Sequence, residues 1–254
     1  MDKRSILTED INMNNTKKLT DYKNTKMIAH MGLSGLEPKN TIAAFIAAGN
    51  RSYFGIETDL HVTKDGKFIV THDDDTLRAT GVSMIVEETD FETLRALNVF
   101  DSDGVSYRSD LHFPSLSEYI SICKKYGKIA VLELKNQFKE EDVYAICEEI
   151  EALDYMSGTI FISFAIDNLH YVRRKYPEQP VQFLLGKEIP EDLPELLKRY
   201  AFDLDIFHKA ITPELIDAVH AVGAKVNAWT VDDPIEAEKL ISYGIDFITS
   251  NIIE

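Results

Sequence analysis

Short apolar stretches alternate with amphipathic stretches over most of this chain, beginning near residue 26. The apolar stretches are rich in β-branched residues and have the length of buried parallel strands, whereas the stretches between them carry apolar residues at helical spacing. The predicted strands are residues 27–30, 55–60, 129–134, 159–164, 181–185, 204–207, 224–230 and 246–249. The predicted helices are residues 41–49 (starting at Asn40 or Thr41, with Ile42, Phe45 and Ile46 as its buried stripe), 117–126, 140–153, 166–176, 193–200, 213–222 and 234–243.

Eight strands joined by helical segments favour a closed barrel of the TIM (β/α)8 type over an open, doubly wound sheet. No glycine-rich nucleotide-binding loop follows the first strand, which also argues against the open sheet. Proline at the starts of the last two helices, in Thr212-Pro213 and Asp233-Pro234, supports their boundaries. The sequence therefore predicts one α/β barrel domain over residues 26–254.

Three segments interrupt this alternation. Asp65-Gly66 favours a tight turn, so residues 68–71 are expected to run back from the second strand as an extended segment. Residues 74–113 hold a short helix at 91–97 among turns, and we predict a small insertion over one mouth of the barrel. Residues 1–25 are expected to be a tail with a short helix that packs under the barrel and fills the space left by a missing eighth helix.

The charge of the chain restricts its partners. With 43 acidic against 27 basic residues, the formal net charge is −16, which disfavours nucleic acid and anionic membrane surfaces. No apolar stretch approaches the roughly 20 residues of a transmembrane helix, and the N-terminus lacks the apolar middle of a secretory signal. We therefore expect a cytoplasmic protein without stable membrane insertion. Cys123 and Cys147 are expected to be buried free thiols.

The clearest candidates for chemistry are carboxylates at strand ends. Glu57 and Asp59 lie two residues apart in the second strand, so they share a face, and Glu133 ends the third barrel strand. Carboxylates gathered in an apolar setting repel one another unless a cation lies between them. Three hard oxygen ligands suit Mg²⁺ or Ca²⁺ better than zinc. The alternative interpretation is a set of ion pairs with lysine.

Two histidines also follow apolar strands. His30 and His72 lie at the expected rim of the barrel, where one can deprotonate an attacking hydroxyl and the other can protonate the leaving oxygen. His61 has the strand parity of the carboxylates and is a candidate wall residue or support for the metal ligands. His208 is a weaker candidate for substrate contact. The remaining three are interpreted as structural: His112, His170 and His220.

Three further side chains are candidates for substrate binding. Lys135 shares a face with Glu133 and is expected to reach the site as a phosphate-binding cation. Trp229 ends the seventh strand, where it is either a pocket wall or part of the core. Phe164 ends the fourth strand and is expected to shape the pocket.

The order of motifs resembles one known family. The chain contains Ala29-His30-Met31-Gly32, Pro38-Lys39-Asn40-Thr41, Ile56-Glu57-Thr58-Asp59-Leu60-His61, Val70-Thr71-His72-Asp73, Leu77-Arg78-Ala79-Thr80, Glu133-Leu134-Lys135, Ser163-Phe164 and Val226-Asn227-Ala228-Trp229-Thr230. This series resembles the glycerophosphodiester phosphodiesterase family from about residue 26 to residue 251. The match is specific because it rests on many motifs in order.

The resemblance implies a TIM barrel with a small insertion after the second strand. It also implies hydrolysis of glycerophosphodiesters, with a divalent metal, to glycerol 3-phosphate and an alcohol. In the family-like mechanism the neighbouring hydroxyl of the glycerol attacks phosphorus, and water then opens the cyclic phosphate. Carried over by position, His30 and His72 are the acid–base pair and Lys135 holds phosphate. The implied metal ligands are Glu57, Asp59 and Glu133.

Two positions depart from the family pattern. Met31 stands where the family has arginine, and Lys39 stands where it has glutamate. Methionine cannot replace the planar, bidentate binding of phosphate by arginine. We hypothesise that the two changes compensate, with Lys39 supplying the positive charge to the substrate from the loop.

Two other functions remain alternatives on the sequence alone. One is a barrel that binds phosphodiesters or metal without turnover, which the absence of the arginine suggests. The other is a phosphodiesterase for a lysophospholipid or for a polymer such as teichoic acid, which requires an apolar or extended groove. The sequence leaves open the alcohol, the choice between Mg²⁺ and Ca²⁺, and the oligomeric state.

Overall fold

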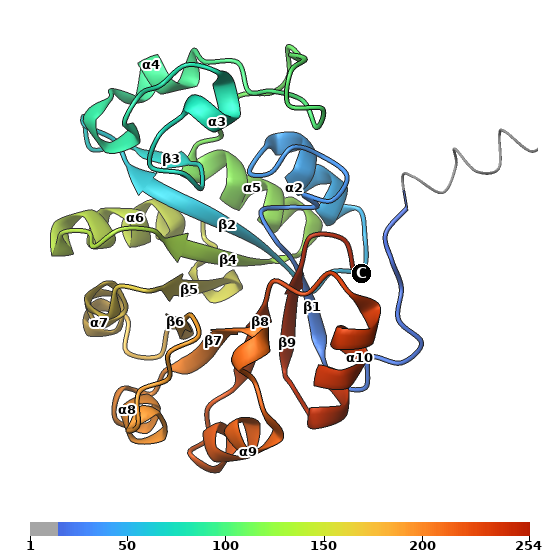
Figure 1. Cartoon of the computed structure of the whole chain (residues 1–254). Coiled ribbons are helices and arrows are strands. Elements are labelled where there is room, and N and C mark those ends of the chain that lie inside the picture. The colour runs from blue at the N-terminus through green and yellow to red at the C-terminus, as the bar shows by residue number, and fades with distance from the viewer. Residues whose placement is uncertain (1–14) are drawn as a thin grey trace, which may run out of the picture.

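The computed structural model of the chain describes residues 15–254, in which eight parallel strands form a closed barrel (Figure 1). These strands are β1 (Lys26–Ala29), β2 (Gly55–Val62), β4 (Ile129–Leu134), β5 (Thr159–Ser163), β6 (Val181–Leu185), β7 (Asp203–Phe207), β8 (Val226–Trp229) and β9 (Phe247–Ser250). They follow one another around the ring in chain order, and β1 pairs with both β2 and β9, which closes the barrel. The predicted TIM barrel is confirmed.

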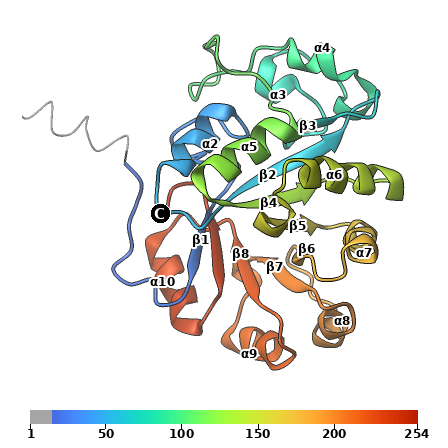
Figure 2. The ribbon, with the colours of Figure 1, turned by 180° about the vertical axis from the view of Figure 1, so that it is seen from behind.

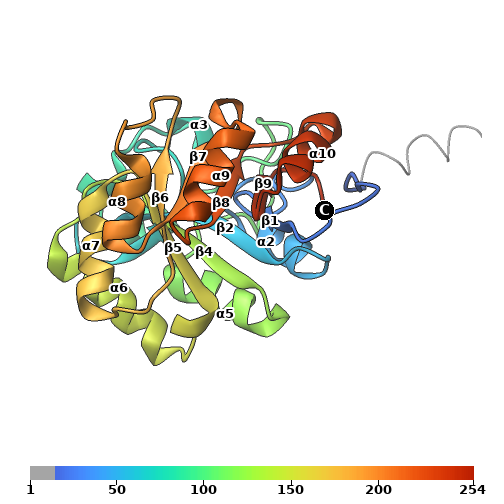
Figure 3. The same cartoon turned by 90° about the horizontal axis from the view of Figure 1, so that it is seen from below.

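Helices surround the strands, as the views along the barrel and from below show (Figure 1 and Figure 3). They are α2 (Ile42–Gly49), α5 (Leu116–Tyr126), α6 (Glu140–Ala152), α7 (Ile166–Lys175), α8 (Leu193–Tyr200), α9 (Pro213–Ala221) and α10 (Pro234–Tyr243). Side-chain caps fix several of their starts: Thr212 and Asp233 accept from the first turns of α9 and α10, and Ser115 with Glu118 forms a capping box on α5.

The interior of the barrel is divided along the strand direction. Alternation within each strand sends every second side chain inward. An apolar cluster inside the ring consists of Ile28, Val131, Ile160, Ile162, Leu184 and Phe247. Toward the carboxyl ends of the strands the interior becomes more polar: Val131 is followed on the same face by Glu133, and Glu57 and Asp59 line the cavity from β2. The fold therefore places polar groups at one mouth of a packed barrel.

The buried face of α2 differs from the predicted stripe. Phe45 is buried and its ring contacts that of Tyr119 in α5 edge-on, with centroids 5.1 Å apart. Ile46, however, is 39% exposed, and the fully buried neighbours are Ala44 and Ala48. The prediction for Ile46 is therefore wrong, and Ile42 is only partly buried, because the small residues Ala44 and Ala48 flank Phe45 on the buried face and a count of large apolar residues does not detect them.

Residues 64–113 add a cap over one side of the barrel. β3 (Phe68–Val70) runs antiparallel to β2, and α3 (Leu77–Thr80), η2 (Val86–Glu88) and α4 (Phe91–Arg95) follow it. The helix expected at 91–97 thus ends at Arg95. A separate apolar cluster holds this segment together: Ile69, Val86, Leu94, Val99, Leu111 and Phe113. Figure 1 and Figure 2 both place α3 and α4 beside β3, away from α8 and α9.

The described part of the N-terminal segment lies against the C-terminus, as all three views show (Figure 1, Figure 2 and Figure 3). Lys17 accepts a backbone hydrogen bond from Glu254 and donates one to Ile252, each at 2.9 Å. Leu19 is buried. Residues 15–25 contain no helix, and the rest of the predicted tail lies outside the described residues.

The two cysteines are free and buried, Cys123 in α5 and Cys147 in α6, which confirms the prediction for them. Among residues 15–254 no helix has the length and apolar character needed to cross a membrane.

The close contact between α2 and α5 predicts an unusual response to alanine at Gly49. A Cβ there would lie 2.6 Å from Cγ and Cδ2 of Tyr126, so Gly49→Ala overpacks the interface, although alanine is normally favoured in helices. We expect the melting temperature to fall by roughly 2–10 °C in a thermal scan. Gly186→Ala is the control, because a Cβ there meets nothing within 4 Å. An unchanged melting temperature for Gly49→Ala would contradict this account of the α2–α5 contact.

Candidate active site

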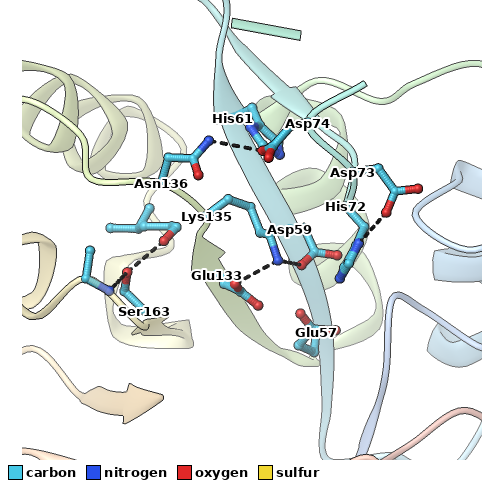
Figure 4. A network of polar contacts seen from close by, with 12 residues as sticks. Glu57, Asp59, His61, His72, Asp73, Asp74, Glu133, Lys135, Asn136 and Ser163 are labelled. Atoms are coloured by element: carbon cyan, nitrogen blue, oxygen red, sulfur yellow. Dashed lines mark hydrogen bonds and ion pairs between the residues drawn. The ribbon is translucent and has the colours of Figure 1, made fainter. Parts of the chain in front are cut away.

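A cavity of about 120 Å³ opens at the carboxyl ends of the barrel strands. Its wall consists of His30, Glu57, Asp59, His72, Glu133, Lys135, Ile162, Phe164, Leu184, Asp205, Trp229 and Thr249. Most of the sequence-predicted residues are thus brought together in one place. The exceptions are Lys39, which lines a neighbouring hollow, and the weaker candidates His61 and His208. Figure 4 shows the polar part of this site.

Three carboxylates occupy the centre of the site. Glu57 and Asp59 project from β2 and Glu133 from β4, and the parallel register pairs Asp59 with Glu133. All three are buried, and each offers an oxygen within 4.8 Å of the others'. Burial, followed by the negative charges of Asp59 and Glu133, raises the pKa of Glu57 well above its ordinary value. Such a cluster is costly unless protons or cations offset its charge.

Lys135 supplies one positive charge to this cluster. Its Nζ lies 2.9 Å from Oε1 of Glu133 and 3.3 Å from Oδ1 of Asp59 (Figure 4). Burial alone would raise the pKa of Asp59, but Lys135, His72 and a hydrogen bond from Asn40 outweigh it and lower that pKa. Lys135 therefore provides an ion-pair partner for both Asp59 and Glu133. It leaves Glu57 without an ion pair to lysine or arginine among the described residues.

The donor set fits a hard divalent cation. Three buried carboxylates carry more negative charge than Lys135 neutralises, and their oxygens are close enough to share one ion. Carboxylate oxygens are the ligands that Mg²⁺ and Ca²⁺ prefer, with water or substrate oxygens completing the shell. Hydrogen bonds hold two of the carboxylates in place: the Met31 N–H donates to Glu57 and the Asn40 amide donates to Asp59.

Two histidines lie beside the carboxylates. Nδ1 of His30 lies 2.8 Å from Oδ1 of Asn251, and the amide of Asn251 is oriented by its donation to Asp232. Nδ1 of His72 lies 2.6 Å from Oδ1 of Asp73 (Figure 4). Since both partners are acceptors, Nδ1 is the protonated nitrogen in each ring, and Nε2 is left for the substrate. Burial is the largest effect on His30 and lowers its pKa.

Aromatic side chains form the outer wall of the cavity. The rings of Phe164 and Trp229 meet edge-on with centroids 5.9 Å apart, and Phe207 lies 5.6 Å from Trp229. Phe164 is 47% exposed. Of the two roles considered for Trp229, the structure shows the pocket wall, because its side chain lines the cavity.

Comparison with known proteins identifies the family. Residues 30–254 match the sequence profile of the glycerophosphoryl diester phosphodiesterase family. The chain belongs to this family. It is therefore a phosphoric diester hydrolase, and the alternative of a barrel without turnover falls away.

Individual relatives agree with this assignment. A glycerophosphodiester phosphodiesterase of Caldanaerobacter subterraneus subsp. tengcongensis is 29% identical over 89% of this chain and 94% of its own length. An Oleispira antarctica phosphodiesterase, whose structure is in complex with the product sn-glycerol-3-phosphate, is 28% identical in sequence to this chain. The two structures superpose with a TM-score of 0.80 over 89% of this chain and 92% of that one. A protein of Silicibacter pomeroyi shares the fold at 24% identity, with a TM-score of 0.82 and coverage of 94% and 92%.

The two departures from the family pattern differ in their surroundings. Met31 is buried and has a positive φ of 51°. Lys39 is partly exposed, and its Nζ lies 3.7 Å from Oδ1 of Asp73. Lys39 shares its hollow with His30, His72 and Arg78, so its charge lies beside the histidines.

The other histidines lie outside the cavity. His61 is buried, and its Nδ1 lies 3.2 Å from Oε1 of Glu87 in η2. It lies on the side of Lys135 that is away from Glu57 (Figure 4). His208 faces Glu236 at 3.8 Å and lines a separate hollow. The three remaining histidines make the following structural contacts: His112 with backbone carbonyls, His170 with Tyr200 and Phe202, and His220 with Asp246.

Sequence reasoning missed several residues that hold or line the site. Asn40 and Asn251 position Asp59 and His30, yet asparagine in a loop carries no distinctive signal. The Pro-Lys-Asn-Thr motif contained Asn40, and its place in that motif was the available clue. Asp205 lines the cavity from β7, and its inward strand parity was the only indication.

The crowding of carboxylates predicts a pH-dependent stability. Burial, followed by the charge of Asp59, raises the pKa of Glu133 from 4.5 to about 7. A carboxyl with a raised pKa binds its proton more tightly in the folded protein, so its favourable contribution is complete below pH 4.5 and is lost as the pH rises through 7. With EDTA present, the free energy of unfolding of Glu133→Gln should therefore rise relative to that of the wild type by roughly 1–3 kcal/mol between pH 4.5 and pH 7.

Melting temperatures measured across that pH range test this prediction. Glu141→Gln, at an exposed position of α6, is the control and should follow the wild type. A difference between Glu133→Gln and wild type that does not change with pH would show that Glu133 is already ionised in the folded protein.

Proposed function

We propose that this hydrolase cleaves glycerophosphodiesters to glycerol 3-phosphate and an alcohol, with a divalent cation and with His30 and His72 as the acid–base pair. The observation that carries the proposal is the placement of two histidines, each with Nε2 left for substrate, around three buried carboxylates. The Oleispira antarctica relative, which binds sn-glycerol-3-phosphate, supports the choice of substrate.

Glu57, Asp59 and Glu133 would hold the cation, which we propose to be Mg²⁺ or Ca²⁺. When bound, it supplies positive charge to the phosphate oxygens and to the attacking hydroxyl. Lys135 would add a second positive charge from the same side, since its Nζ already lies between Asp59 and Glu133. Phe164 and Trp229 would flank the substrate at the mouth of the cavity.

The two histidines have different surroundings, which suggests different roles. Burial lowers the pKa of His30, so the ring is neutral near pH 7 and suits the base that deprotonates the C2 hydroxyl of glycerol. The new oxygen–phosphorus bond forms a cyclic phosphate as the bond to the alcohol breaks. His72, whose Nδ1 is held by the Asp73 carboxylate, gives a proton from Nε2 to the leaving oxygen. Water then opens the cyclic phosphate with the roles reversed.

We propose that Lys39 replaces part of the charge that Met31 cannot provide. The Met31 side chain is buried, whereas Lys39 stands at the cavity mouth beside His72. The Lys39 Nζ lies 3.7 Å from Oδ1 of Asp73, which is a weak ion pair. The flexible lysine side chain could exchange this contact for one with a phosphate.

The acid–base roles predict the effect of removing each histidine. His30→Ala and His72→Ala should each lower kcat for a glycerophosphodiester by roughly 10²- to 10⁴-fold, because each removes a proton transfer. Release of glycerol 3-phosphate is measured with Mg²⁺ or Ca²⁺ and with EDTA, which should abolish turnover. His220→Ala is the control, because His220 lies away from the cavity, beside Asp246. Wild-type turnover in either alanine variant, or full activity in EDTA, would refute this mechanism.

The Lys39 proposal makes a separate prediction about substrate binding. Lys39→Gln should raise KM by roughly 2- to 10-fold with little change in kcat, since a partly exposed charge contributes modestly. Met31→Arg combined with Lys39→Glu restores the family pattern and should recover the wild-type KM. Lys64→Gln, on the exposed surface after β2, is the control. No change in KM in any single or double variant would exclude compensation between the two positions.

A further inference from the structure

The cavity contains a carboxyl group that the proposed chemistry does not use. Asp205 projects inward from β7, is only 2% exposed, and still lines the cavity. Its Oδ1 has no hydrogen-bond partner among the described residues. By contrast, each of the other three carboxylates in the cavity has a hydrogen-bond donor or an ion-pair partner. Asp205 therefore belongs to the wall of this cavity and has one buried oxygen that no described protein group satisfies.

The neighbours of Asp205 cannot easily supply the missing partner. Asn227 is its register partner on β8 and contributes some hydrogen bonding, but the Asn227 amide also donates to Thr249 at 3.1 Å and to Gln182 at 3.4 Å. A buried polar atom without a partner costs free energy, and buried polar groups in proteins are almost always satisfied. An open oxygen on a cavity wall is thus a position where a bound molecule would complete the hydrogen bonding.

The surroundings restrict what that molecule presents to Asp205. Asp205 is acidic, so a neutral hydrogen-bonding group suits it better than an anionic phosphate oxygen does. A carboxyl group accepts a hydrogen bond and, when protonated, also donates one. An alcohol hydroxyl has the same dual character. Apolar Ile162 and Leu184 line the cavity as well and suit the carbon chain of a small polyol.

We infer that Asp205 is a specificity-determining residue that hydrogen-bonds the terminal hydroxyl of the glycerol moiety. The inference rests on the proposed function, in which the C2 hydroxyl attacks phosphorus beside His30 and only the terminal hydroxyl remains free. With the phosphate held beside Lys135, that hydroxyl would reach the part of the cavity wall that Asp205 forms.

This contact decides between substrate classes. A cavity of about 120 Å³ is smaller than the roughly 300–1,000 Å³ of sites for drug-sized ligands. An acyl chain on the terminal hydroxyl would remove the hydrogen-bond donor that Asp205 accepts from, and it would add bulk that a cavity of this volume does not hold. The enzyme thus selects diesters with a free glycerol over lysophospholipids, whose glycerol is acylated.

The test compares glycerophosphocholine with an analogue in which propane-1,2-diol replaces glycerol, so that only the terminal hydroxyl is missing. Choline release gives kcat/KM for both. We expect wild type to favour glycerophosphocholine by roughly 10- to 100-fold, the range for a hydrogen bond to a buried polar group. Asp205→Leu and Asp205→Ala should bring this ratio close to one, mainly through a higher KM for glycerophosphocholine. Asp205→Asn, which can still donate and accept, should retain part of the preference.

The matched control is Asp203→Asn on the same strand, since Asp203 accepts from the Lys225 N–H and lies outside the cavity. It should keep the wild-type ratio. A wild-type ratio in folded Asp205→Leu or Asp205→Ala would overturn the inference. Failure of the proposed function appears differently, as no turnover of glycerophosphocholine by the wild type itself. Replacing an unsatisfied buried carboxyl by leucine is often neutral or stabilising, so this variant is expected to fold.

Discussion

Electrostatic repulsion among three buried carboxylates is the constraint on which the site depends. The parallel register of β2 and β4 places Asp59 beside Glu133, and strand alternation adds Glu57 to the same face. Closure of the barrel prevents the strands from moving apart to relieve this charge. The nearby groups are arranged in response: Lys135 bridges Asp59 and Glu133. An asparagine amide also donates to Asp59, and a backbone N–H donates to Glu57. Charge that remains uncompensated would favour the binding of a cation.

The barrel can carry this charge because its interior is layered. Beneath the carboxylates the inward side chains are apolar and tightly enclosed, and the helices add a second apolar layer outside the strands. Stability therefore comes from packing that does not involve the site. The segment after β2 has its own small core and brings His72 and Asp73 to the mouth of the cavity. The chemistry thus combines a rigid interior with a separately folded cap.

Much of the fold followed from the sequence, because buried parallel strands and amphipathic helices have strong, distinct periods. The TIM barrel was predicted correctly for this reason. The face of α2 was not, since Ala44, Ala48 and Gly49 achieve close packing with little apolar area. At the site, carboxylates in apolar strands stood out as anomalies. Asn251 and Asp205 did not, because their significance depends on which strands become neighbours around the ring, and a single strand does not reveal that.

The methionine at position 31 shows how a family position can lose its side chain and keep its structural role. The backbone N–H of Met31 donates to Glu57 at 2.8 Å, and any residue except proline can supply that bond. Its φ of 51° turns the chain so that this N–H points into the site. The carboxylate cluster is therefore unaffected by the loss of arginine, and only the charge offered to phosphate is missing. Lys39 and Arg78 line the hollow beside His72 and place positive charge there from two other segments. In the proposed function, positive charge from these two segments would replace part of the charge of the missing arginine.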